Sequence, residues 1–74
     1  MLEYTMESED ILRVDEKIYG WNNTEHRIIR YNIKTWESQL SYVDKKKWVT
    51  DRWEKMNQSS IDWVKKYYLP KVGK

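Results

Sequence analysis

Two secondary structures compete for residues 27–43, whose sequence is RIIRYNIKTWESQLSYV. Apolar side chains recur there at steps of four, three, four and three residues, as on one side of a helix: Ile29, Ile33, Trp36, Leu40 and Val43. Apolar and polar side chains also alternate from Ile29 to Thr35, which is typical of a strand. We predict a helix, because the helical spacing continues through Leu40 and Val43, where the alternation has stopped.

Helices are also predicted before and after this stretch. Residues 8–19 carry Ser8 as an N-cap, and Gly20 follows the last turn. Asp44 is expected to cap a helix over residues 45–57, and Ser59 a helix that ends at Leu69, before Pro70. The predicted fold is therefore all-α, a bundle of three to four short helices. It forms one domain over residues 1–74, with a lead-in at 1–7 and a basic tail at 70–74.

An α+β fold is the alternative. Here the alternating residues form an N-terminal β-hairpin, in which residues 12–21 pair with residues 27–36. Two C-terminal helices would then pack on this hairpin. The window 27–36 favours the alternative, since it is rich in β-branched and aromatic side chains.

Composition excludes several classes of protein. The chain has 74 residues, five Trp, six Tyr and no Phe, so tryptophan and tyrosine must build part of a thin core. With no Cys and a single His, it can form neither a disulfide nor a thiolate metal site. No nucleophile motif surrounds a serine, no glycine-rich loop is present, and His26 is expected to be an exposed or capping residue. We therefore predict no enzyme activity, no metal and no cofactor.

Charge is divided unevenly along the chain. Residues 1–43 contain five basic and eight acidic side chains, and residues 44–74 contain nine basic and four acidic ones. In the basic half, aromatic and cationic side chains lie away from the inner stripes of the two predicted helices. These are the predicted partner-binding residues: Lys45, Trp48, Arg52, Lys55, Trp63, Lys66 and Tyr67. The alternative for Trp48 and Trp63 is that they pack against neighbouring helices.

These patterns predict a small non-enzymatic binding protein that docks on a larger host protein or defence complex and modulates or inhibits it. The many residues with AT-rich codons point to an AT-rich genome, such as that of a phage, a mobile element or a low-GC host, and we expect a phage or mobile-element gene. Nucleic-acid binding through the same basic aromatic helices is the alternative. Self-association is open. A membrane span is not expected, since no apolar run approaches ~20 residues. A membrane-surface role is disfavoured, because the last predicted helix is short and acidic residues interrupt the basic face. With no secretory signal in the sequence, the expected location is the host cytoplasm.

Overall fold

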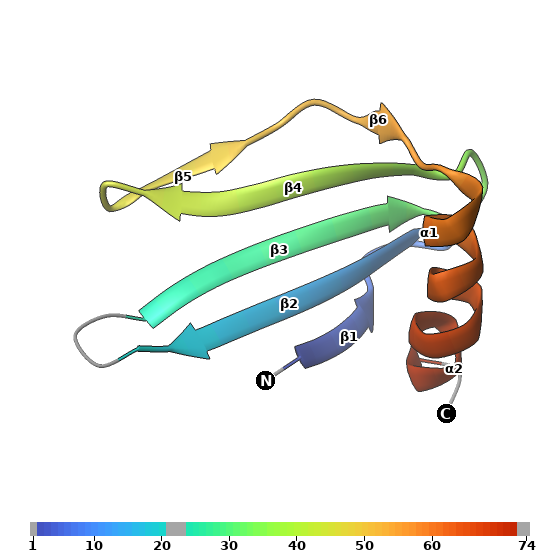
Figure 1. Cartoon of the computed structure of the whole chain (residues 1–74), viewed down its shortest axis with the longest axis horizontal. Helices are drawn as coiled ribbons and strands as arrows, with labels where there is room; N and C mark the ends of the chain where they lie inside the picture. The colour runs from blue at the N-terminus through green and yellow to red at the C-terminus, as the bar shows by residue number, and fades with distance from the viewer. Residues whose placement is uncertain (1, 21–23, 73–74) are drawn as a thin grey trace.

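The computed structural model describes residues 2–20 and 24–72, and these form an antiparallel sheet with one C-terminal helix (Figure 1). The strands are β1 (Leu2–Met6), β2 (Ile11–Tyr19), β3 (Thr24–Asn32), β4 (Glu37–Asp44), β5 (Lys47–Thr50) and β6 (Glu54–Lys55). The helix consists of α1 (Gln58–Trp63), a π-helical turn η1 (Val64–Tyr68) and α2 (Leu69–Val72). None of the described helical segments is long and apolar enough to cross a membrane.

The sheet has the order β1-β2-β3-β4-β5, and β6 also pairs with β4. Residues directly opposite one another share a face, so the register assigns the side chains to two faces. Leu12, Val14 and Tyr31 lie on the face that carries the helix, which we call the helix-side face. Arg13, Asp15 and their cross-strand neighbours lie on the opposite face, which we call the back face.

The all-α prediction is wrong, and the cause lies in the spacing. A step of four residues fits a strand as well as a helix, because it is two full strand periods. The step from Ile33 to Trp36 falls in the turn between β3 and β4. Leu40 and Val43 are three residues apart in one strand, so they occupy opposite faces of the sheet. The hairpin alternative was closer, since β2 pairs with β3 in antiparallel register.

The other predicted helix boundaries also need correction. Residues 8–19 form the turn after β1 and then β2, and the predicted lead-in, residues 1–7, contains β1. Residues 45–57 contain β5 and β6. The α+β alternative predicted two C-terminal helices, and the structure has one. The helix cap is Asn57 in place of Ser59: its side chain accepts a hydrogen bond of 2.8 Å from the Ser60 amide.

Pro70 lies within the helix and does not end it. A proline has no amide hydrogen and its ring crowds the carbonyl four residues earlier, so a regular α-helical turn is disfavoured there. The wider π turn η1 comes directly before it, and the Leu69 amide donates to the Val64 carbonyl, five residues back. The predicted tail at 70–74 therefore belongs to α2 as far as Val72, while residues 73–74 lie outside the described part.

A small core joins the helix to the sheet. Leu12, Val14 and Val64 are fully buried. Partly buried side chains surround them, several of them aromatic: Tyr4, Met6, Tyr31, Ile33, Trp36, Met56, Tyr68, Leu69 and Val72. The Tyr68 ring lies 5.4 Å from that of Tyr4 and 5.8 Å from that of Tyr31, within the range of favourable aromatic pairs. Tyrosine thus supplies much of the core of a chain that has no phenylalanine.

The back face holds a polar network. The Arg13 guanidinium donates two hydrogen bonds of 2.9 Å to the Asp15 carboxylate, and His26 Nε2 lies 3.3 Å from the same carboxylate. Ser41 is buried and lies 3.1 Å from both Arg30 Nη1 and Thr50 Oγ1. These contacts satisfy polar groups on the back face, where Ile28 is also buried.

The turn between β4 and β5 is strained. Its two central residues, Lys45 and Lys46, have φ values of 49° and 69°. Positive φ at both positions is the geometry of a type I′ hairpin turn, which favours Asn-Gly. A lysine there brings its Cβ close to the backbone, at a cost of about 1–2 kcal/mol per residue.

Replacing Lys46 with glycine is expected to raise the free energy of unfolding by about 0.5–1 kcal/mol, because glycine adopts positive φ without this clash. Urea unfolding followed by circular dichroism measures the change. Lys46→Ala is the matched control: it removes the same charge but keeps a Cβ, and should give no gain. Equal stabilisation by both variants would show that charge, and not backbone strain, is responsible.

The Asp15 carboxylate should contribute stability that depends on pH. Hydrogen bonds from Arg13 hold its pKa below the ordinary value, burial opposes this effect, and the hydrogen bond with His26 adds to it. Because the pKa is lower in the folded chain, this stability is present above the unfolded pKa, ~3.9, and is lost as pH falls through the folded pKa.

Asp15→Asn is therefore expected to lower the free energy of unfolding at pH 7 by about 1 kcal/mol, a value reduced for partial exposure of the pair. The difference from wild type should shrink as the pH falls below about 4. Glu16→Gln, in the more exposed ion pair with Arg27, is the control and should cost less than about 0.5 kcal/mol. A deficit of Asp15→Asn that stays constant down to about pH 2 would contradict the assignment.

Candidate functional site

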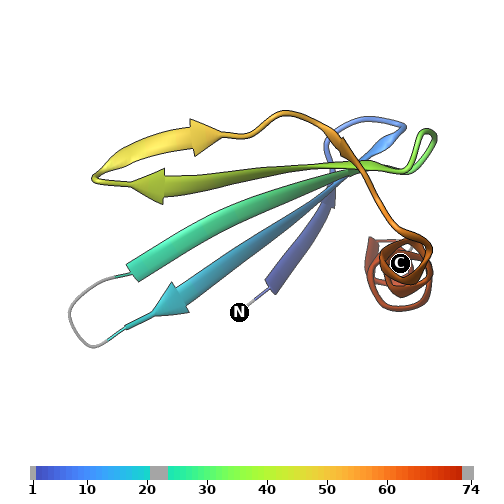
Figure 2. The same ribbon diagram turned by 45° about the horizontal axis from the view of Figure 1, so that its top comes forward.

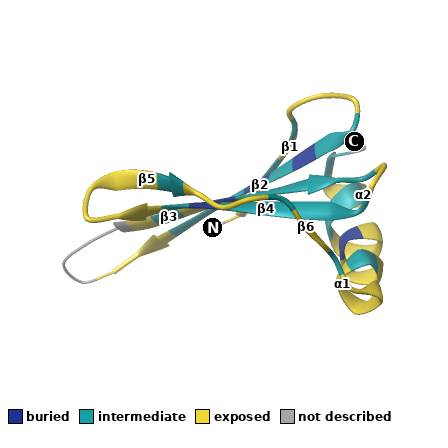
Figure 3. Cartoon of the chain, turned by 90° about the horizontal axis from the view of Figure 1, so that it is seen from above, coloured by how far each residue is buried: buried dark blue, intermediate teal, exposed yellow. Residues whose placement is uncertain are grey.

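The helix covers only one end of the helix-side face. In Figures 1 and 3 it crosses the strands at one end of the sheet, and the strands extend well beyond it. Apolar side chains on this uncovered part form two adjacent rows across β3, β4 and β5. Ile29 lies opposite Leu40 in one row, and Tyr42 lies opposite Val49 in the next. We call these four residues the open patch.

The dimensions leave room for another element beside the helix. Strands β2 and β3 have nine residues each, which corresponds to about 30 Å. A helix packed across them covers about 10 Å of that length. Figure 2, in which the helix is seen end-on, shows this arrangement. All four side chains of the open patch are only half-buried. The sheet thus keeps apolar surface that its own helix does not fully cover.

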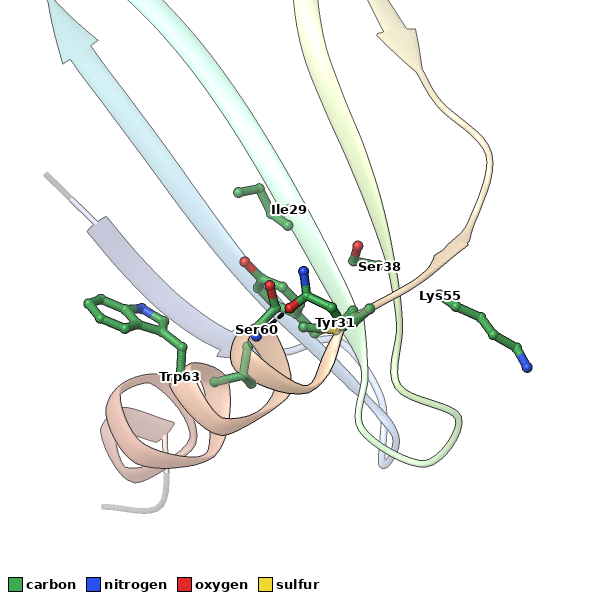
Figure 4. Close-up of a pocket in the computed structure, with 9 residues that line it drawn as sticks. Ile29, Tyr31, Ser38, Lys55, Ser60 and Trp63 are labelled. Atoms are coloured by element: carbon green, nitrogen blue, oxygen red, sulfur yellow. Dashed lines mark hydrogen bonds between the residues drawn. The ribbon is translucent and has the colours of Figure 1, made fainter.

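Two aromatic rings on the helix are exposed and contact each other. Trp63 and Tyr67 are 54% and 43% exposed, and their ring centroids are 4.4 Å apart at an interplanar angle of 49°. Figure 4 shows the Trp63 indole extending away from the helix, on the side where β1 is drawn, and Trp63 also lines a pocket with Ile29. Lys66 Nζ lies 5.3 Å from the centre of the Tyr67 ring, a cation–π contact. The aromatic pair is therefore preassembled on the exposed side of the helix, and its Trp63 ring lies at the pocket that Ile29 of the open patch also lines.

A pocket of about 300 Å³ occupies the angle between helix and sheet (Figure 4). Its lining combines apolar side chains with hydroxyl and amide groups: Ile29, Tyr31, Ser38, Lys55, Met56, Asn57, Ser60, Trp63 and Val64. The ammonium group of Lys55 points away from the other lining residues. Burial raises the pKa of Tyr31 to about 12, so its hydroxyl is neutral at physiological pH. The pocket suits an uncharged group of the size of a large side chain that has both apolar and hydrogen-bonding parts.

An ion pair borders the open patch. Glu16 and Arg27 lie opposite each other on β2 and β3, in the same row as Tyr42 and Val49, and their side chains form a salt bridge. Arg27 is exposed. An apolar centre beside a charged rim is the usual composition of a protein-binding surface.

The seven residues predicted to bind a partner do not form one face. The helix brings Trp63, Lys66 and Tyr67 together, and Lys55 contributes to the pocket. Arg52 is exposed in the connection between β5 and β6, and Lys45 lies in the strained turn.

Trp48 lies on the back face, away from the helix. Its ring packs edge-on against His26, with centroids 5.0 Å apart and an interplanar angle of 76°. His26 also contacts Asp15, so it is half-buried in a side-chain network and is neither a capping residue nor fully exposed. Residues 45–57 contain strands, so the helical face that the prediction assigned to them is not formed. A strand alternates its side chains between two sides of the sheet.

The helical interpretation of the sequence did not predict the open patch. Ile29 and Leu40 were placed on an inner helical stripe, where a core position is expected. The signal that identifies the patch is alternation in neighbouring strands, which puts Ile29, Leu40 and Tyr42 on one face. A single short helix cannot cover so many apolar rows.

The site offers contacts suited to binding. The described residues that line the pocket contribute no carboxylate and no imidazole. Within residues 2–20 and 24–72, no three His, Asp or Glu side chains are grouped so that they could hold a metal ion.

Comparisons with protein-family models, with curated proteins and with solved structures found no match to this chain. Its function is therefore argued from the geometry of the open patch, the pocket and the Trp63–Tyr67 pair.

Proposed function

We propose that this chain is a non-enzymatic protein-binding module that docks on a larger protein through the open patch and the Trp63–Tyr67 pair. The observation that carries the proposal is that an apolar sheet face is covered along only part of its length. Soluble domains bury such a face against a second layer. Here a partner supplies the missing part of that layer.

The partner element that fits is an amphipathic helix. It lies beside the chain's own helix and packs on Ile29, Leu40, Tyr42 and Val49, which span three strands and two rows. Three strands at about 4.8 Å spacing give a patch about 10 Å wide, which matches the apolar stripe of two helical turns. One large uncharged side chain of the partner, such as tyrosine or tryptophan, enters the pocket next to Trp63 and acts as the hot-spot anchor of the interface.

The biological setting is proposed from the sequence. The composition suggests a phage or mobile-element protein that acts in the host cytoplasm, and occupation of a host or defence protein by this module would modulate or inhibit it. Nucleic-acid binding remains the alternative prediction. It has less support from the geometry, because Trp48 lies on the back face while Trp63 and Tyr67 lie beside the helix-side face.

A photo-crosslinking residue at position 42 tests the proposal directly. We expect p-benzoylphenylalanine in place of Tyr42 to form an adduct with one larger protein in nuclease-treated host lysate, because position 42 lies in the open patch. Adding Trp63→Ala should strongly reduce the yield of the adduct. The matched control replaces Tyr19, which is 70% exposed on the back face, and should form no such adduct. Adducts at both positions, at neither, or only with a second copy of the chain would contradict the proposal.

Affinity measurements with the captured protein separate the two functions. Trp63→Ala is expected to weaken binding about 30-fold, as for a hot-spot aromatic, and Tyr19→Ala less than about twofold. Raising the salt from about 50 to about 200 mM should change the affinity only slightly, whereas a nucleic-acid binder with roughly 6–10 phosphate contacts would lose ~10³-fold or more. A steep salt dependence would therefore favour the alternative.

A further inference from the structure

The two edges of the sheet differ in how they are protected against pairing with another strand. At one edge, β5 and β6 have only four and two residues. The Asp51 amide donates a hydrogen bond to the Leu40 carbonyl and so continues the β5 pairing. Three residues further on, Glu54 lies opposite Ser38. Between these two points Arg52 and Trp53 together face the single residue Gln39, which is a bulge. This bulge, the short strands and the lysine-rich turn are features that block edge pairing.

The other edge, strand β1, lacks such features. Its sequence LEYTM contains no proline, lysine or arginine, and its one charge is Glu3. β2 pairs with it on one side, and no strand among the described residues pairs with its outer side. The Leu2 side chain on this strand is 41% exposed. An edge strand that lacks these features is a template for a further strand.

The hydrogen-bond pattern identifies which backbone groups face outward. The Glu7 amide donates to the Ile11 carbonyl, so Glu7 and Ile11 form a hydrogen-bonded pair of the β1–β2 ladder. Such pairs alternate with non-hydrogen-bonded pairs in an antiparallel ladder. The backbone amides and carbonyls of Thr5 and Glu3 therefore form hydrogen bonds with β2. The amides and carbonyls of Leu2, Tyr4 and Met6 face away from the sheet.

We propose that β1 pairs antiparallel with β1 of a second copy of this chain, centred on Tyr4. In this register Tyr4 lies opposite Tyr4 of the second copy, and Leu2 opposite Met6. All the outward backbone groups of the two strands are then paired. The exposed Leu2 side chain gains an apolar neighbour on the helix-side face.

Charge also favours this register. Centring on Tyr4 places Glu3 opposite the neutral Thr5 of the second copy. Centring on Glu3 would instead place two glutamates directly opposite each other, which is destabilising. The pairing is thus self-complementary, and a second copy is the partner it fits.

Variants at position 5 test the proposal with opposite expected signs. In a single chain Thr5 lies opposite Arg13, so Thr5→Glu is compatible with the monomer fold. In the dimer the carboxylate that this substitution introduces lies opposite Glu3 of the second copy, and the two-fold symmetry creates this repulsive contact twice. Dimerisation should therefore weaken about tenfold. Thr5→Lys places opposite charges there and should strengthen it. The double variant Glu3→Lys/Thr5→Glu restores an attractive pair and should recover dimerisation.

Sedimentation equilibrium of the full chain from ~10 µM to ~1 mM gives the dissociation constants. Amide hydrogen exchange locates the interface: protection of the Tyr4 and Met6 amides should rise with protein concentration in wild type and less so in Thr5→Glu. A wild-type chain that stays monomeric overturns the proposal. So does a dimer that Thr5→Glu leaves unchanged, or one in which these two amides show no concentration dependence. The crosslink from position 42 to the larger partner should persist in Thr5→Glu, so failure of the dimer and failure of partner binding are separate results.

Discussion

Val64 is the only fully buried side chain of the described helix, and it packs in one cluster with Leu12 and Val14 of β2. Burying a valine stabilises by about 1.5–3 kcal/mol, a large share of the stability of so small a domain. The residues that surround this contact fix the helix across one end of the sheet. The pocket, the position of Trp63 and the uncovered rows of the sheet all follow from that placement.

The apolar spacing of the sequence is compatible with both a sheet and a helical bundle. The turns between the strands decide between these two folds. Asn32 accepts hydrogen bonds of 2.9 and 3.0 Å from the amides of Lys34 and Thr35, so its side chain organises the turn after β3. Trp36 then takes a φ of 57°, which is uncommon for a bulky residue. Neither of the lysines in the next turn is a residue expected at positive φ. Turns built from Trp and Lys carry little local signal, and a helical stripe therefore looked continuous across them.

Parts of the candidate site were predictable and parts were not. The proximity of Trp63, Lys66 and Tyr67 followed from their spacing in a segment that is helical in both the prediction and the structure. The open patch required knowledge of strand register, because Leu40 and Val49 become neighbours of Ile29 and Tyr42 only through pairing. Trp48 was assigned to the same face as Arg52 and Lys55 on the assumption of a helix. In β5 the same residue packs on His26.

The two proposed surfaces are compatible in space. The open patch lies over β3, β4 and β5, whereas the self-pairing edge is β1, at the far side of the sheet. A two-fold axis midway between the two Tyr4 residues, perpendicular to the sheet, would leave both helix-side faces pointing the same way. A dimer would then offer two docking sites to a partner with two copies of the target helix. The bulge at Arg52 and Trp53 limits how many copies of the chain can associate through their strands. Since each copy has one edge that accepts a strand and one that does not, association through the described strands stops at a closed pair and does not continue into an open-ended fibril.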